Sequence, residues 1–457
     1  MSKYQAYPEY KDSGIEWLGD IPEHWVVAEL KRYSRVQGGY AFSSDSFVDS
    51  GIPVIRIGDI KQDGTISLES CKYIQDEVST QYKDFEVRSG DLLMAMTGAT
   101  IGKAGWFKGS QRALLNQRVG SFKCNKSFLN YKFFWYVLNS LGYQEYIKIT
   151  AFGGAQPNIS DTGMVSYQSA IPDLIEQEKI ASFLNHETAK IDTLIDKQQQ
   201  LIQLLKEKRQ AVISHAVTKG LNPSAPMRDS GVEWLGKVPE HWSFPKVKWF
   251  FKTESGGTPN TSRYEEYYQD GDIPWIRSTD LNNNELFETP IAITSKAIRE
   301  SACTVIPTNS VLIAMYGGAG TIGKHTLLKF ESAINQAVCA ILPTNKINPD
   351  FLHLYVEFYR PYWMVGAEGA RKDPNINQET IRELVVSSPP YDEQVEIVKV
   401  IQQKIAVIDQ TVSKCEKNIQ LMQERRVALI SAAVTGKIDV RHHASHPAGN
   451  DTSEVSA

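Results

Sequence analysis

The fold of this chain is constrained most by the stretch 176–218, which contains no proline or glycine. Apolar residues recur along it at steps of three and four, starting with Ile180 and Leu184. That spacing predicts a long helix whose apolar stripe packs against a second helix. Three polar residues interrupt the stripe: Glu187, Gln198 and Arg209. Such interruptions can fix the register and the partner of a helix at some cost in stability.

A second stretch of the same kind supplies the partner. Residues 393–435 repeat the first stretch without a gap, so that Ile191-Asp192 matches Ile408-Asp409 and Ala216-Val217-Thr218 matches Ala433-Val434-Thr435 at one constant offset. We therefore expect the two helices to pair within the chain. The alternative is that each helix packs only on the domain beside it, although a single domain rarely needs so long a helix.

A short segment rich in tryptophan is repeated at the same offset as the two helices. Residues 12–25 read DSGIEWLGDIPEHW, and residues 229–242 read DSGVEWLGKVPEHW. We expect each copy to bury its tryptophans against another element. Because the second copy follows the first long helix directly, symmetry places the first copy beside the end of the second helix, near Thr435. The two ends of the chain should then lie close together, in a pseudo-twofold arrangement.

Two variable regions, 27–171 and 245–388, lie between these repeats and are diverged copies of each other. The matching pieces are Gly38-Gly39 with Gly256-Gly257, GIPVIRIGDI (51–60) with DIPWIRSTDL (272–281), DLLMAMTGATIGK (91–103) with SVLIAMYGGAGTIGK (310–324), Asn116-Gln117 with Asn335-Gln336, and QPNI (156–159) with DPNI (373–376). The β-branched runs PVIRI, VLIAM and AVCAIL predict strands, while YKFFWYVLNSL and DFLHLYVEFYR predict helices.

The predicted fold class is α/β (α+β), with two globular domains on two long helices. In chain order we expect an N-terminal docking segment at 1–26, a first domain at 27–171, a long helix at 172–220, a repeat of the docking segment at 221–244, a second domain at 245–388, a second long helix at 389–437 and a disordered tail at 438–457. The three histidines of the tail, in HHASH, are too weak a pattern to predict a metal site.

Composition narrows the class of protein. The chain has 457 residues and a formal net charge of −4, which argues against a protein that coats nucleic acid by charge alone. Its five cysteines form no CxxC pair, as is typical of a reduced cytosolic protein without a zinc site. No signal peptide and no membrane-spanning segment is predicted, so we expect a cytoplasmic protein that does not contact membranes.

Two segments are similar to catalytic motifs but do not match them fully. GAGTIGK at 318–324 has the spacing of a phosphate-binding loop, yet His325 stands where magnesium needs a serine or threonine hydroxyl, and the copy GATIGK at 98–103 is one residue short. We therefore interpret both as backbone turns rather than an ATP site.

The second segment is SPPY at 388–391, which is similar to the motif that holds a flipped base in amino-methyltransferases. Its counterpart, Ala-Ile-Pro-Asp at 170–173, lacks the second proline and the aromatic residue. The simpler interpretation is that Pro389 and Pro390 begin the second long helix, as Asp173 with Glu176 at a capping-box spacing begins the first.

Taken together, the repeated EWLG–PEHW, IPVIRIGDI, TIGK, Asn-Gln and PNI pieces and the long helix ending in AVT resemble the specificity subunit of type I restriction-modification systems. The resemblance covers nearly the whole chain. It implies two target-recognition domains that each read half of a split sequence in double-stranded DNA, and an antiparallel coiled coil that sets the gap. It also implies two modification subunits and restriction subunits as partners. S-adenosylmethionine, ATP and magnesium would belong to those partners, and this chain would be non-catalytic and without cofactor or metal.

Candidate DNA-binding residues are the polar residues on the glycine-bearing loops. In the first domain they are Tyr40, Ser43, Arg56, Thr97, Lys103, Arg118, Gln156 and Asn158. In the second they are Thr258, Arg277, Tyr316, Lys324, His325, Arg371, Lys372 and Asn375. For each of them, a purely structural role in a solvated loop is an equally good interpretation, and Asn116 and Asn335 are expected to bond the backbone of a turn. Candidate partner-docking residues are Trp17, Trp25, Trp234 and Trp242.

Two alternatives from other classes remain. One is an amino-methyltransferase that acts on its own, which binding of the methyl donor by the isolated chain would identify. The other is a coiled-coil scaffold that binds no DNA. A scaffold, however, would have no reason to carry recognition domains that have diverged while their helices stayed alike.

Overall fold

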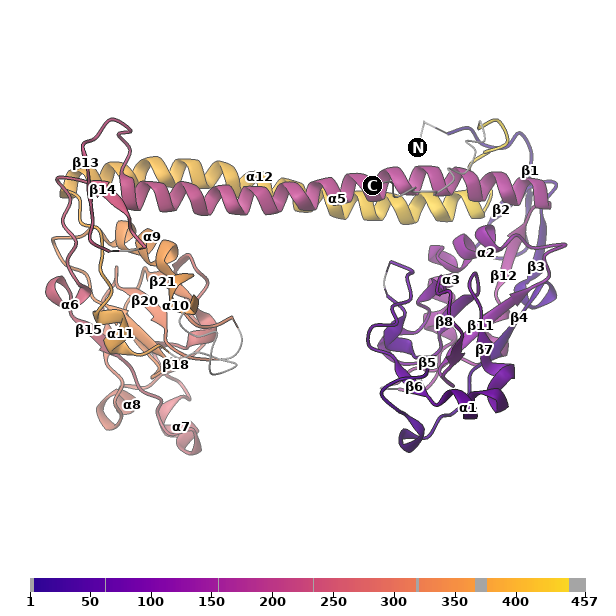
Figure 1. Cartoon of the computed structure of the whole chain (residues 1–457), viewed down its shortest axis with the longest axis horizontal. Helices are drawn as coiled ribbons and strands as arrows, with labels where there is room; N and C mark the ends of the chain where they lie inside the picture. Colours follow the sequence, from indigo (N-terminus) through magenta and orange to yellow (C-terminus); the bar gives the residue numbers. More distant parts are fainter. Residues whose placement is uncertain are drawn as a thin grey trace. The chain divides into compact units, whose positions relative to one another are not determined.

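A computed structural model describes residues 4–61, 63–154, 156–232, 234–317, 320–365 and 376–443 of the chain. The chain divides into two compact units. Unit 1 contains Met1–Gln198 with Lys417–Ala457, and unit 2 contains Gln199–Glu416. Each long helix therefore belongs to both units, and each unit holds one variable region (Figure 1).

The two long helices are α5 (Leu174–Lys219) and α12 (Tyr391–Val434), close to the predicted bounds. Asp173 caps the start of α5, because its carboxylate accepts a hydrogen bond of 2.8 Å from the N–H of Glu176. At α12, Pro389 and Pro390 precede the first helical residue, as expected of prolines at a helix start. Both helices end at a glycine with a positive φ, Gly220 at 74° and Gly436 at 73°.

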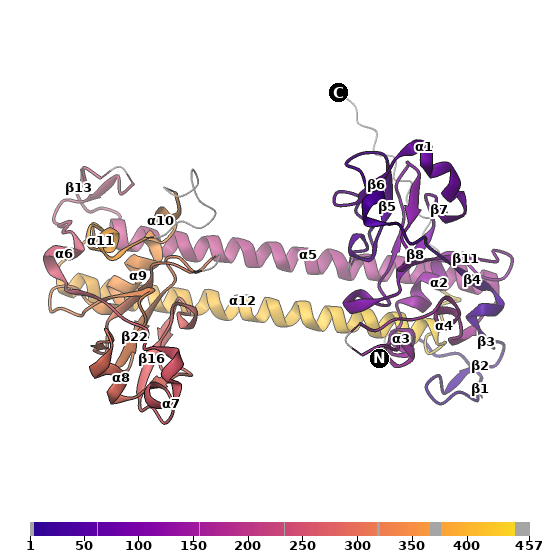
Figure 2. The same ribbon diagram turned by 90° about the horizontal axis from the view of Figure 1, so that it is seen from below.

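The helices pair with each other inside each unit, as predicted. In unit 1, Ile180 and Leu184 of α5 share a core with Ile430 and Ala433 of α12. The pairing is antiparallel, because Asp192 contacts Arg426 while Lys179, nearer the start of α5, bonds the carbonyl of Arg441 beyond the end of α12. In both views α5 and α12 run side by side (Figures 1 and 2).

Unit 2 repeats this arrangement with the other helix halves. Ile213 and Val217 of α5 share a core with Ile397 and Ile401 of α12. The same two cores also contain residues of the neighbouring domains. Each helix therefore packs both on its partner helix and on the domain beside it.

Unit 1 contains two four-stranded sheets with orders β6-β5-β10-β7 and β4-β11-β8-β9, and two-stranded pairs β1-β2 and β12-β3. Its strands are β1 (Tyr10–Asp12), β2 (Asp20–Pro22), β3 (Val26–Glu29), β4 (Ser34–Gly38), β5 (Ile52–Ile55), β6 (Lys72–Ile74), β7 (Glu86–Val87), β8 (Leu92–Ala95), β9 (Ala104–Trp106), β10 (Ala113–Leu115), β11 (Val119–Cys124) and β12 (Gln168–Ile171). Its short helices are α1 (Asp76–Ser79), α2 (Tyr131–Leu138), α3 (Leu141–Thr150) and α4 (Asp161–Val165).

Unit 2 has similar sheets, with orders β18-β16-β22-β19 and β15-β23-β20-β21-β17 and a pair β13-β14, and β17 is a fifth strand that the matching sheet of unit 1 lacks. Its strands are β13 (Met227–Asp229), β14 (Lys237–Pro239), β15 (Thr253–Ser255), β16 (Ile273–Ile276), β17 (Glu285–Leu286), β18 (Ala292–Ile293), β19 (Val305–Ile306), β20 (Val311–Ala314), β21 (His325–Leu328), β22 (Ser332–Ile334) and β23 (Val338–Ile341). Its short helices are α6 (Val247–Phe250), α7 (Tyr264–Tyr267), α8 (Ser295–Glu300), α9 (Pro349–Tyr359), α10 (Tyr362–Val365) and α11 (Gln378–Arg382).

Strands and helices lie where the sequence predicted them. The runs PVIRI, VLIAM and AVCAIL overlap β5, β20 and β23, and the two aromatic runs overlap α2 and α9. In each unit, one sheet has a parallel pair of strands at its centre: β5 with β10 in unit 1 and β16 with β22 in unit 2. The outer strands of these sheets pair antiparallel with the central ones. The α/β, or α+β, fold class is confirmed.

The tryptophan segments are attached to the start of a long helix in the same way in both units. Trp25 and Trp242 are 0% and 1% exposed in their cores. The histidine before each tryptophan contacts a glutamate in the first turn of a helix, His24 with Glu176 and His241 with Glu393, both at 2.8 Å. The Glu176 side chain therefore reaches the tryptophan segment rather than completing a capping box with Asp173.

The N-terminal segment lies beside the end of α12, as predicted from symmetry. The hydroxyl of Tyr10 donates to the carbonyl of Gly436 at 3.0 Å, and the N–H of Asp439 donates to the carbonyl of Gln5 at 2.8 Å. The prediction of a disordered tail from residue 438 needs correction, because Ile438 and Val440 are buried in the core of unit 1. Residues 444–457 lie outside the described part of the chain.

Candidate nucleic-acid interface

In unit 1 the predicted loops meet at one edge of the sheets. β11 is antiparallel to β4 and β8, so the end of β4, the end of β8 and the start of β11 lie at the same edge. Backbone hydrogen bonds join the loops there: Gln117 N–H to Tyr40 O and Met96 N–H to Arg118 O, both 2.9 Å. Ile159 N–H also donates to Met96 O at 3.0 Å, which brings the PNI loop to the same place. We call this region the loop edge.

The second sheet of unit 1 ends at the same place. β5 and β10 are parallel, so both carboxyl ends point one way, and the N–H of Asn116 donates to the carbonyl of Ile55 at 3.0 Å. Arg56 therefore begins its loop beside Asn116. Six of the eight candidates of the first domain belong to these bonded loops or directly follow β5: Tyr40, Arg56, Thr97, Lys103, Arg118 and Asn158.

Unit 2 has a loop edge with matching backbone bonds. Met315 N–H donates to Ala337 O at 2.8 Å, Asn335 N–H to Ile276 O at 2.9 Å and Ile376 N–H to Met315 O at 3.0 Å. Ala337 therefore takes the backbone position that Arg118 has in unit 1. The same backbone frame is built twice, and the side chains on it differ.

One repeat match from the sequence shifts by a residue in the structure. Gly38 pairs with Gly120 and Ser255 with Cys339, so the structural equivalents are Gly39 and Gly256. At each of these a Cβ atom would overlap a backbone carbonyl oxygen of the segment alongside. Only glycine allows this close approach.

Candidate side chains in the first domain divide by exposure. Tyr40, Ser43, Arg118 and Gln156 are exposed, whereas Arg56, Lys103 and Asn158 are half-buried. Ser43 caps the turn that follows it by accepting from Asp45 N–H. Arg56 follows β5 and donates its N–H to the Asp59 carboxylate at 2.8 Å.

In the second domain, most of the candidate side chains that the structure describes already have partners. Arg277 pairs with Asp280 through two nitrogens, at 3.0 and 3.2 Å, and this ion pair raises the pKa of the guanidinium. The hydroxyl of Tyr316 donates to the carbonyl of Gln336 at 2.9 Å, and the hydroxyl of Thr258 bonds the Gln336 side chain. Lys324 is half-buried.

Two candidates lie in the interior, so their assignment as DNA-binding residues needs correction. His325 is 1% exposed at the start of β21, and burial lowers its pKa well below the usual 6.5. Thr97 is 8% exposed. Neither side chain can reach a base without a rearrangement. Arg371, Lys372 and Asn375 lie outside the described residues.

The sequence interpretation missed one pair of side chains at the loop edge. Gln117 is exposed beside the end of β4, and Gln336 is exposed beside the end of β15. The Asn-Gln repeat was the available signal. Its asparagine has the predicted structural role in unit 2, where Asn335 accepts a bond of 3.1 Å from the N–H of Ala337, which leaves the glutamine facing outward.

The two glycine-rich segments form backbone turns. Lys103 N–H donates to Thr100 O and Lys324 N–H donates to Thr321 O, each at 3.0 Å. Gly102 and Gly323 have positive φ values of 81° and 66°. With the same turn in both copies and a buried histidine after the second, the interpretation as a turn holds for the described residues.

The tryptophan segments expose different amounts of their side chains. Trp17 is 48% exposed and stacks on Tyr167 with ring centroids 4.5 Å apart. Trp234 is half-buried against Tyr359 at 4.8 Å. Because Trp25 and Trp242 lie inside their cores, their assignment as partner-docking residues is corrected to a structural role.

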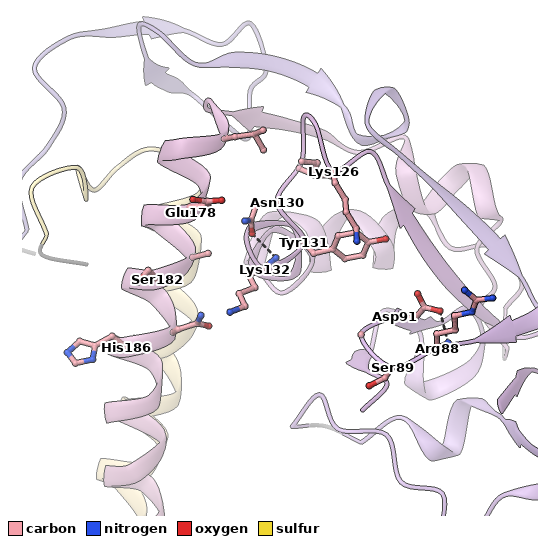
Figure 3. A pocket seen from close by; sticks show the side chains of 15 residues that line it. Arg88, Ser89, Asp91, Lys126, Asn130, Tyr131, Lys132, Glu178, Ser182 and His186 are labelled. Atoms are coloured by element: carbon pink, nitrogen blue, oxygen red, sulfur yellow. Dashed lines mark hydrogen bonds between the residues drawn. The ribbon is translucent and has the colours of Figure 1, made fainter. Parts of the chain in front are cut away.

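A hollow of about 1000 Å³ in unit 1 lies at the opposite end of β8 and β11 from the loop edge. Residues of α5, among them Glu178, lie on one side of it, and Tyr131 and Lys132 of α2 lie across from them, whereas the ring of His186 points away from α2 (Figure 3). The remaining lining residues include Arg88, Asp91 and Lys126. The hollow is therefore separate from the predicted DNA-binding loops.

Across the described ranges, no helix is long and apolar enough to cross a membrane, and no three His, Cys, Asp or Glu side chains are placed to hold a metal ion.

Comparison with known proteins identifies the repeated unit. A family described as "Type I restriction modification DNA specificity domain" matches residues 22–204 and 239–421, two ranges at the same offset as the repeats in the sequence. The chain belongs to this family. Its two specificity domains each contain one variable region and most of the helix that follows.

Relatives of similar length occur among curated proteins. The specificity subunit of the type I restriction enzyme EcoBI from Escherichia coli is 27% identical, with 98% of this chain and 93% of the relative covered. A putative type I restriction enzyme MjaX specificity subunit from Methanocaldococcus jannaschii is 22% identical, with 96% and 99% covered.

Solved structures share the fold. A chain from a study of assembly and conformational transition of the type I R-M system has a TM-score of 0.70 at 14% identity, with 91% of this chain and 98% of that chain covered. The HsdS subunit from Thermoanaerobacter tengcongensis has a TM-score of 0.51 at 15% identity, with 92% and 98% covered.

Proposed function

We propose that this chain is the DNA specificity subunit of a type I restriction-modification complex. The observation that carries the proposal is the loop edge, which is built twice on one backbone frame with different side chains, such as Arg118 against Ala337. Two domains that share a frame but differ at exposed positions suit the recognition of two different half-sites. The names of the full-length relatives support the same function.

The partners follow from this function. Two modification subunits would bind, one for each repeat, and restriction subunits would complete the assembly. They would carry S-adenosylmethionine, ATP and magnesium, so this chain itself would be non-catalytic. We expect the complex to act in the cytoplasm, where the DNA is. The SPPY segment gives little support to a self-sufficient methyltransferase, because its prolines precede α12 and the amide of Gln394 donates to the carbonyl of Pro389.

Exchange of one domain tests the proposal. Residues 27–171 are replaced by the corresponding region of the Escherichia coli relative, and the modified sites are mapped in a host that also makes the modification subunit. We expect one half of the two-part target to change and the other half to stay. A target that changes in both halves, or no two-part target at all, would contradict the proposal.

A second prediction concerns docking of the modification subunits. Trp17 is exposed and belongs to a repeated segment, so we expect Trp17→Ala to weaken assembly with modification subunits while the DNA target stays the same. Trp249→Ala is the matched control, because Trp249 is 64% exposed but lies outside the repeated segment. Assembly is measured by gel filtration of the mixed subunits, after circular dichroism shows the fold intact. Equal assembly by both variants would argue against a docking role for Trp17.

A further inference from the structure

The side chains at the loop edge fall into two classes. Those of the repeated class occur at matching positions in both units, and those of the unrepeated class occur in one unit only. The repeated class includes Gln117 with Gln336 and Lys103 with Lys324, whose sequences and turns match. The unrepeated class includes Arg118, whose position in unit 2 is taken by the 6% exposed Ala337. Contacts to phosphates carry no sequence information, so two domains with different targets can share them. Contacts to base edges must differ between the domains.

Arg118 stands at the centre of the loop edge. It directly precedes β11, the strand that lies between β4 and β8. Its backbone is held on both sides. Its carbonyl accepts the N–H of Met96 at 2.9 Å, and the N–H of the preceding Gln117 donates to Tyr40 at 2.9 Å. A side chain on so constrained a backbone is presented in a defined place.

The side chain of Arg118 is available for a ligand. It is exposed, and the described residues include no ion-pair or hydrogen-bond partner for its guanidinium. The other arginine candidates that the structure describes differ, since Arg56 and Arg277 lie beside Asp59 and Asp280. Among the exposed candidates of the first domain, Arg118 is the one with a positive charge.

We propose that Arg118 reads a guanine in the half-site bound by the first domain. This inference rests on the proposed function. The guanidinium presents paired N–H donors, and guanine alone among the bases shows two acceptors, O6 and N7, side by side in the major groove. An arginine without a counterpart in the second domain then specifies a guanine in the first half-site only.

The test uses the complex of this chain with its modification subunits. Modified sites are mapped for the wild type, Arg118→Ala and Arg118→Lys, and binding is measured on duplexes that carry each base at the assigned position. We expect a fixed guanine in the first half-site of the wild type. Arg118→Ala should accept other bases there and bind the guanine duplex about 5- to 150-fold more weakly. Arg118→Lys should keep part of the preference for guanine, because lysine also contacts its O6 and N7.

Arg88→Ala is the matched control, since Arg88 is an exposed arginine at the opposite end of the same sheet, beside Asp91. It should leave the target unchanged. If Arg118→Ala weakens binding to all four duplexes equally, the side chain contacts phosphate and the inference is wrong. A change in the second half-site would also overturn it. A wild type without any two-part target would instead contradict the proposed function, so the two failures can be told apart.

Discussion

At the scale of single residues, the second domain contains a pair of buried histidines beside the helix pair. The rings of His325 and His353 are 4.9 Å apart, and each Nε2 lacks a hydrogen-bond partner among the described residues. Burial lowers the pKa of His353 to about 4 and that of His325 well below its usual 6.5. The positive charges of Arg209, Arg360 and Lys329 act in the same direction. Both rings are therefore neutral in the folded protein near pH 7.

This pair predicts a loss of stability in mild acid. The unfolded chain protonates both histidines near pH 6.5, whereas folded His353 resists protonation down to about pH 4. The contribution of the neutral pair to the free energy of unfolding is therefore fully present above about pH 6.5. It falls toward pH 4, by up to about 1.4 kcal/mol per pH unit for each histidine. Glu357 opposes the trend, because burial raises its pKa and its folded form takes up a proton first.

The measurement is thermal unfolding of the full chain at pH 7, 5.5 and 4.5. His353→Gln should flatten the dependence on pH, whatever it does to stability at pH 7. The control is His215→Gln, which removes an exposed histidine and should keep the wild-type slope. Identical slopes for all three proteins would show that the pair does not govern acid stability.

Sequence patterns selected the candidate DNA-binding loops but could not say which side chains on them are available. Arg56 and Arg277 each have an aspartate three residues later, a local signal that could have shown their partners. The burial of His325 and Thr97 has no such signal, since it depends on how distant strands close over these residues. Gln117 was not among the candidates, because the Asn-Gln repeat was interpreted only through the structural role of its asparagine.

At the scale of elements, the long helices were the most predictable part of the chain. Their period of three and four persists over many turns, so α5 and α12 begin and end within a few residues of the predicted bounds. The polar interruption at Arg209 has a clear role in unit 2, where Arg209 contacts both Asp409 of α12 and Glu357 of α9. The repeat equivalent in unit 1 is Arg426 with Asp192, at 2.9 Å.

The two pairs predict different responses to reversal of charge. Arg426→Asp should destabilise the helix pair by about 0.5–1 kcal/mol, and adding Asp192→Arg should restore most of this, because the pair is half-exposed and has no third member among the described residues. Arg209→Asp should lower the free energy of unfolding by about 1–3 kcal/mol, and adding Asp409→Arg should restore a smaller share of it. The reason is that the Glu357 side chain is only 12% exposed and is left without a partner on α5. Denaturant unfolding of the four variants measures both rescues, and equal rescue in the two pairs would refute the role given to Glu357.

At the scale of the whole molecule, the two halves of the chain are copies of each other in sequence and in structure. The tryptophan segments, the sheets, the helix starts and the family matches all repeat. The duplication could be predicted from sequence because the offset between the copies stays constant, without a gap, across the long helices. The sequence could not predict the shifted glycine match or the packing of residues 438–440, since both depend on contacts made far along the chain.

The last prediction tests whether the helix pair sets the gap between half-sites. Four helix-forming residues are inserted after Gln200 and after Lys417, which are equivalent positions of the two repeats. They add about 6 Å to each helix, and base pairs are spaced by about 3.4 Å, so the gap can grow by at most about two base pairs. Four residues exceed a full turn by about 40°, which shifts the apolar stripe without reversing it. We expect both half-sites to persist with a gap longer by one or two base pairs when modified sites are mapped. Insertion in α5 alone is the control, because it mismatches the paired stripes and should impair stability instead of lengthening the gap. A double insertion that keeps both half-sites and the original gap would show that the helices do not set the length of the gap.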